Sequence, residues 1–182
     1  MKKILLCLCI FCFAVSTSAL AEEADIVRIR SHYQKIRQAL PNFKRVHINV
    51  DDLSTEGGEA QAYYDTQGHI RLVTTQLFFE SGKTFEEHYY ADDALIFVLS
   101  TDHRYNVPIY VDQETADEFH CEAFDPKKSK ILENRYYFSS GKMIRWLDGN
   151  KKAVSPEHSE FIDAEKTVVH NAQEFYSRFQ RK

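Results

Sequence analysis

Residues 62–73 read AYYDTQGHIRLV, and this stretch decides the fold because it has the pattern of a β-hairpin. Two tyrosines are followed by a turn at Thr66-Gln67-Gly68 and then by an apolar segment that starts at Ile70. Aromatic and β-branched residues favour strands, and a glycine-bearing turn between two such segments is typical of a hairpin. The stretch therefore predicts two adjacent antiparallel strands.

The same pattern occurs twice more along the chain, as HYYADDALIFV at residues 88–98 and RYYFSSGKMIRWL at residues 135–147. An insertion at roughly residues 107–128 delays the third unit. Within it, residues 107–111 predict a short edge strand, because Pro108 has no N–H for a strand ladder. A polar stretch at residues 113–124 predicts a helix. Three hairpins in series predict an antiparallel meander.

Amphipathic helices are expected at both ends of the hairpin region. Pro41 ends the first helix, at residues 24–40; Ser155 is the expected N-cap of the second, with Pro156 at its first position. Apolar residues spaced three and four apart form one stripe on each helix. The stripes are Ile26, Ile29, Tyr33, Ile36 and Leu40, and Phe161, Ala164, Val168, Ala172, Phe175 and Phe179.

These elements predict an α+β fold: a curved antiparallel β-meander of about seven to nine strands with an N-terminal and a C-terminal helix. Residues 44–50 alternate as a further strand, and residues 80–83 form a further turn. Residues 95–99 are apolar on both faces, which predicts a central strand that is covered on both sides. The two helices are expected to cover one face of this strand, and sheet curvature or a partner is expected to cover the other face.

The tyrosine-pair, turn and apolar-strand units resemble repeats in uncharacterised secreted bacterial proteins and, more loosely, MORN-type repeats. The resemblance covers residues 60–147 at most, and the glycine-rich core of MORN repeats is missing. It implies a sheet of repeated hairpins and no particular functional residue.

The first 21 residues have the layout of a secretory signal peptide, with a basic start at Lys2-Lys3, an apolar run and small residues at Ala19 and Ala21. The apolar run is too short to cross a bilayer as a helix. We expect cleavage after Ala21, which leaves a single domain at residues 22–182. The expected location is therefore the periplasm or the extracellular space.

Removal of residues 1–21 changes the net charge from −4 to −6, because that segment holds two lysines and no acid. This charge argues against nucleic acid or an anionic membrane as the main partner. A second long apolar run is missing from the sequence, so no membrane-spanning helix is expected. Cys121 is then the one remaining cysteine, so an intramolecular disulfide is not expected.

No catalytic or cofactor motif is recognisable in the sequence. His120-Cys121 lacks a family signature, and a partly buried thiol packed with Phe119 and Phe124 is the expected arrangement. Residues 112–125 hold six acids and no lysine or arginine, which predicts a solvated acidic loop, with a site for a cation or basic partner as the alternative. The eight histidines show no zinc spacing, so no metal and no cofactor are expected.

The tyrosine pairs have two interpretations. Cross-strand packing is one, and an exposed aromatic platform for a ligand is the other. One face is expected to hold Tyr63, Tyr89 and Tyr136, and the other Tyr64, Tyr90 and Tyr137. The candidate binding residues are these six tyrosines together with Asp117 and Glu118 of the acidic loop.

The function expected from the sequence is an exported, non-catalytic binding or interaction module that uses a sheet face. Its partner is a protein or small ligand of apolar and basic character. Two alternatives remain open: a small secreted hydrolase with an unpatterned carboxylate or His-Cys site, and an exported factor that acts on another cell.

Overall fold

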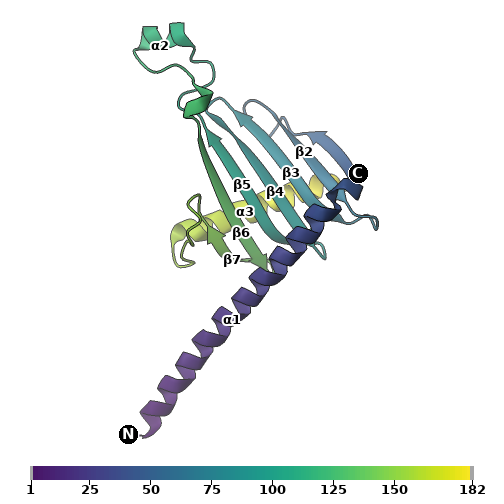
Figure 1. Cartoon of the computed structure of the whole chain (residues 1–182), viewed down its shortest axis with the longest axis vertical. Helices are drawn as coiled ribbons and strands as arrows, with labels where there is room; N and C mark the ends of the chain where they lie inside the picture. Colours follow the sequence, from purple (N-terminus) through teal and green to yellow (C-terminus); the bar gives the residue numbers. More distant parts are fainter. Residues whose placement is uncertain (1, 181–182) are drawn as a thin grey trace.

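The computed structural model describes the backbone of residues 2–180 and the side chains of residues 20–180. It is an α+β structure in which a seven-stranded antiparallel sheet lies between two long helices (Figure 1). The elements, in chain order, are α1 (Lys2–Ala39), η1 (Leu40–Asn42), β1 (Lys44–Asn49), β2 (Gly58–Tyr64), β3 (Ile70–Phe79), β4 (Gly82–Ala91), β5 (Ala94–Arg104), α2 (Gln113–Phe119), η2 (Pro126–Lys128), β6 (Lys130–Ser139), β7 (Lys142–Leu147) and α3 (Ser159–Gln180).

The sheet is a meander, because its strand order from β1 to β7 is the order of the sequence. All six neighbouring pairs are antiparallel, and the three predicted hairpins are β2–β3, β4–β5 and β6–β7. The predicted fold class, meander and terminal helices are therefore confirmed. Each hairpin is closed by its local turn, so the topology follows from short-range sequence signals.

The two long helices cover opposite faces of the sheet, so the prediction that they cover one face together is wrong. On one face, Ile26, Ile29 and Ile36 of α1 pack against a cluster that includes Tyr89 and Phe97. On the other face α3 contributes Phe161, Val168, Ala172, Phe175 and Phe179. This arrangement explains why residues 95–99 are apolar on both sides. We call the two sides the α1 face and the α3 face.

The third tyrosine pair is reversed relative to the first two. Cross-strand pairing places Tyr137 beside Phe97 on the α1 face, which leaves Tyr136 on the α3 face beside Val98. In the first two units the register shifts between the tyrosines, but in the third it shifts one residue later, between Tyr137 and Phe138. The structural equivalent of a tyrosine pair in the third hairpin is therefore Tyr137-Phe138.

Helix α3 begins at Ser159, four residues after the predicted cap. The Val154 N–H donates to the Trp146 carbonyl, which holds residue 154 beside β7 instead of in a helix. Ser155 to His158 then form a turn closed by the His158 N–H, with Pro156 at the second position that proline favours. Proline here therefore starts a turn and not the helix.

Candidate functional site

The insertion between β5 and β6 forms an arm that projects from one end of the sheet (Figure 1). The arm comprises residues 105–129 and contains α2 and η2. The predicted edge strand at residues 107–111 is wrong, since this segment has no ladder pairing. Instead, the Ile109 N–H donates to Glu80 and the Val111 N–H donates to Pro108. The first bond ties this segment to the turn between β3 and β4, and the second closes a local turn.

Asn106 joins the two ends of the arm at its base. Its side-chain nitrogen donates to the Ala123 carbonyl over 2.9 Å, and its oxygen accepts the Asp125 N–H over 3.0 Å. The Phe124 N–H donates to the Val111 carbonyl, and the Phe124 ring lies against Tyr105 with centroids 5.1 Å apart. The base of the arm is thus a defined structure fixed by polar and aromatic contacts.

The helix at the tip of the arm, α2, has a capping group at each end. Asp112 accepts the Thr115 N–H over 2.9 Å, and hydrogen bonds from Thr115 lower the pKa of this carboxyl. At the other end His120 adopts the left-handed conformation at φ 51°, and the Cys121 N–H donates to Ala116. Ala116 is buried, while Asp117 and Glu118 are exposed to solvent.

The arm exposes large apolar side chains next to its carboxylates. Ile109, Tyr110 and Phe119 are 55%, 61% and 68% exposed, and Ile131 at the adjoining start of β6 is 61% exposed. The arm also contains six acids and two lysines, which gives it a net charge of −4. One ion pair, Lys128 to Glu122 at 2.9 Å, lies within it and lowers the pKa of Glu122. The arm is therefore an acidic surface with exposed apolar groups.

Asn106→Ala is expected to loosen the arm while the sheet stays folded. The substitution removes the bonds to Ala123 and Asp125 and a longer one to Glu122 at 3.4 Å, which are together worth about 1–4 kcal/mol of local stability. Hydrogen exchange should show loss of protection at the amides of Phe124 and Asp125, with the β4 and β5 amides unchanged. Asn150→Ala, in an exposed loop, is the control and should change neither region. Unaltered protection of the arm in Asn106→Ala would contradict the assigned role of Asn106.

Cys121 is exposed, so the predicted packing of its thiol with Phe119 and Phe124 is wrong. Phe119 projects into solvent and Phe124 turns inward to Tyr105, because the seven-residue α2 is too short to enclose a pocket between them. No hydrogen bond joins the His120 and Cys121 side chains among the residues described. The pair therefore lacks the contact between nucleophile and base that thiol catalysis needs.

The six candidate tyrosines do not form an exposed row. Tyr89, Tyr90, Tyr136 and Tyr137 are buried, and Tyr63 and Tyr64 are half-buried. Their rings pack with other aromatic groups or helix backbone: Tyr137 lies 5.0 Å from Phe97, and the Tyr90 hydroxyl donates to Ala172 of α3. Burial raises the pKa of Tyr89, Tyr90 and Tyr136. The structure thus places these tyrosines in the core.

A buried polar cluster, absent from the candidates named from the sequence, lies under α3. His88 is 0% exposed, and its Nε2 lies 3.0 Å from Glu86, which Ser100 also hydrogen-bonds. Burial alone would raise the pKa of Glu86, but the bonds from His88 and Ser100 outweigh it and lower the pKa. The sequence signal was the Glu86-x-His88 spacing, which puts both side chains on one strand face. The carboxylate, not the imidazole, lies between the other two groups, and α3 covers them, which is unlike a hydrolytic triad.

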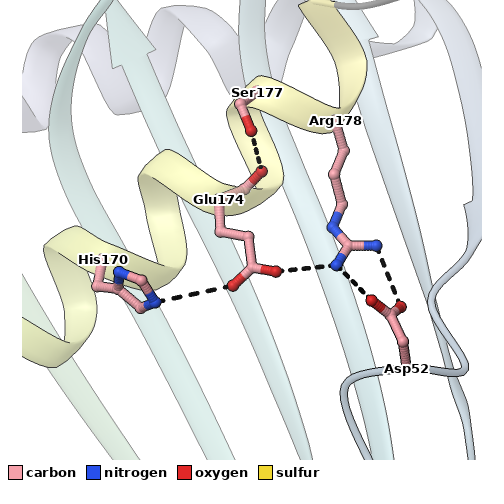
Figure 2. A network of polar contacts seen from close by, with 5 residues as sticks. All are labelled: Asp52, His170, Glu174, Ser177 and Arg178. Atoms are coloured by element: carbon pink, nitrogen blue, oxygen red, sulfur yellow. Dashed lines mark hydrogen bonds and ion pairs between the residues drawn. The ribbon is translucent and has the colours of Figure 1, made fainter.

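A second polar network fixes α3 to the loop between β1 and β2 (Figure 2). Arg178 binds both carboxylate oxygens of Asp52, at 3.1 and 2.7 Å, and also Glu174 at 2.8 Å. The Arg178 hydrogen bonds lower the pKa of Asp52. His170 lies 3.9 Å from Glu174, and Ser177 donates to the Glu174 carbonyl. Asp52 therefore helps to hold α3 against this loop.

The described residues contain no group of three or more His, Cys, Asp or Glu side chains that could hold a metal ion. In the same part of the chain, no helix combines the length and apolar character needed to cross a membrane. Comparison with protein-family models, curated proteins and solved structures finds no match. The candidate site is therefore characterised by its geometry alone: an open antiparallel sheet carries a projecting acidic arm.

Proposed function

We propose that this protein is an exported, non-catalytic interaction module that binds a partner protein through the arm. The observation that carries the proposal is the position of its exposed apolar groups. Seven large apolar side chains are exposed among residues 20–180, and four of them, Ile109, Tyr110, Phe119 and Ile131, belong to the arm and the strand start beside it. Apolar groups gathered on a projecting element mark interaction surfaces.

The negative charge of the arm supports a partner with a basic surface. The arm has a net charge of −4, and its carboxylates belong to the same segment as the exposed apolar groups. A partner surface with lysine or arginine around an apolar centre would be complementary in both respects, and such complementarity speeds association and favours the correct partner. The partner proposed here is therefore a protein with a basic, apolar contact surface.

Export rests on the first 21 residues, and the contacts of α1 are compatible with cleavage after Ala21. Leu20 and Ala21 are exposed, whereas Glu22 and Glu23 bind Arg145 of β7 at 2.8 and 3.1 Å. Cleavage would leave acidic residues in the first turn of the shortened helix, where the helix dipole favours negative charge. N-terminal sequencing of the exported protein is expected to begin at Glu22; a retained Lys2-Lys3 would contradict cleavage.

The test is capture of partners from the exported fraction with arm variants as bait. Phe119→Ser and Tyr110→Ser should each weaken capture of the bound protein by tenfold or more, about the effect of one interface hot spot. Ile162→Ser removes an exposed apolar group from α3 and is the matched control. Equal capture by all three variants would contradict the role of the arm. A charge test adds Asp117→Asn with Glu118→Gln, which should slow association at low salt.

A further inference from the structure

A cavity of about 380 Å³ opens between α1 and strands β5 and β6, away from the arm. Its apolar lining includes Ile29, Phe97 and Tyr137, of which each is buried. The Tyr33 ring meets Phe97 edge-on with centroids 5.5 Å apart, which makes one wall aromatic. Small-molecule sites have volumes from about 300 to 1,000 Å³ and mostly apolar walls. The cavity therefore has the size and lining for a compact organic ligand.

Two guanidinium groups and one carboxylate supply the charged part of the lining: Arg30 on α1, and Arg135 and Glu133 on β6; Gln34 of α1 adds an uncharged amide. Arg135 Nη2 is paired with Glu133, but Arg135 Nη1 is buried and has no hydrogen-bond partner. A buried donor without a partner is costly, and guanidinium donors match the two oxygens of a carboxylate. The local charge of +1 matches one negative charge on a ligand.

Arg37, further along α1, is an arginine on the same face whose side chain has hydrogen-bond partners. Its Nη1 lies 3.2 Å from Glu87 and 3.5 Å from the Tyr89 hydroxyl, and that hydroxyl donates to Glu87 over 2.6 Å. Glu87 is directly across the sheet from Leu99, which in turn is across from Arg135. The two arginines therefore lie on either side of Leu99, and only the one at the cavity keeps a buried donor unpaired.

We infer that this cavity is a binding site for a small monocarboxylate with an apolar or aromatic body. The carboxylate is attracted by the guanidinium groups of Arg30 and Arg135, of which Arg135 has one donor, Nη1, without a protein partner. The apolar body lies against Phe97, Leu99 and Tyr137. The site is separate from the arm, so the inference does not depend on the proposed partner.

The experiment is calorimetric titration of the exported protein with phenylacetate, hexanoate and benzoate, and with the amide of each. At least one carboxylate should bind with a dissociation constant of about 1 mM or tighter, and its amide should bind at least about tenfold more weakly, because a charged hydrogen bond is lost. Absence of binding by all three acids, or equal binding of acid and amide, would overturn the inference. Phenyl phosphate is also titrated, and tighter binding than phenylacetate would overturn the monocarboxylate assignment.

Two further measurements locate the bound probe. Arg135→Gln should weaken binding by about tenfold or more, whereas Arg178→Gln, which removes a guanidinium from α3, should leave it unchanged. NMR of the unmodified protein serves if Arg135→Gln is unstable: the amide signals of Leu99, Arg135 and Tyr137 should shift on titration. Shifts confined to other parts of the protein, or unchanged affinity in folded Arg135→Gln, would overturn the site.

Discussion

Replacement of Phe175 by alanine is expected to lower the free energy of unfolding by about 3–5 kcal/mol. The Phe175 side chain is 2% exposed and packs in the cluster that joins α3 to strands β2, β3 and β4. It also lies beside His88, with ring centroids 6.0 Å apart. Domains of this size are stable by about 5–15 kcal/mol, so one such loss is a large share. Urea unfolding followed by circular dichroism measures the change.

Phe119→Ala is the matched control, because the same side chain is removed from an exposed position on the arm. We expect its free energy of unfolding to stay within about 0.5 kcal/mol of the original protein. A loss of similar size in both variants would contradict the assignment of Phe175 to the core and of Phe119 to the surface. An unchanged Phe175→Ala would mean that α3 does not stabilise the sheet through this residue.

Replacement of Glu86 by leucine is expected to cost about 3–5 kcal/mol, because a buried hydrogen-bonding partner is removed from His88 and Ser100 together. The Nδ1 of His88 and the hydroxyl of Thr75 already lack hydrogen-bond partners among the residues described, so loss of the Glu86 carboxylate would add further unpaired polar groups to this cluster. Glu86→Gln keeps an acceptor oxygen and should cost less. Glu80→Gln, at an exposed turn, should have little effect on the same unfolding measurement.

Acid should act on the same carboxyl group. The folded state lowers the pKa of Glu86 below its usual value of 4.5, so its contribution to stability is present above that pH. This contribution is lost as the pH falls through the lower, folded-state pKa. The stability difference between the original protein and Glu86→Gln should therefore shrink as the pH falls below about 4.5. A difference that grows with acid would contradict the hydrogen bonds assigned to the Glu86 carboxylate.

The sequence was sufficient for the meander because the signals that form it are local. Each hairpin contains its own aromatic pair and its own turn, and α1 and α3 show apolar stripes with helical spacing. The shift at Tyr137-Phe138 was not predictable from these signals, since the tyrosine pair in the sequence and the register shift in the structure differ by one residue. The side of the sheet that each helix covers depends on packing between distant residues, which the periodicity of one helix does not specify.

The candidate sites were less predictable for a related reason. The arm was recognised as a polar insertion, but its projection depends on Asn106 bonding to Ala123 and Asp125, far along the chain. The cavity combines Arg30 with Arg135, which are 105 positions apart in the sequence and meet through helix packing. Cys121 was expected in a pocket from the average behaviour of cysteine, and the short α2 provides no such pocket.

Site-specific cross-linking at Cys121 tests the proposed role of the arm most directly. After the expected cleavage, Cys121 is the only thiol, so a photoreactive maleimide marks the arm without a substitution. The comparison protein carries Cys121→Ser with Ser140→Cys, which moves the thiol to the exposed β6–β7 turn. We expect the Cys121 label to cross-link a defined partner from the exported fraction, in competition with unlabelled protein, and the Ser140→Cys label not to do so. Equal cross-linking from both positions, or cross-linking from the β6–β7 turn alone, would contradict the account.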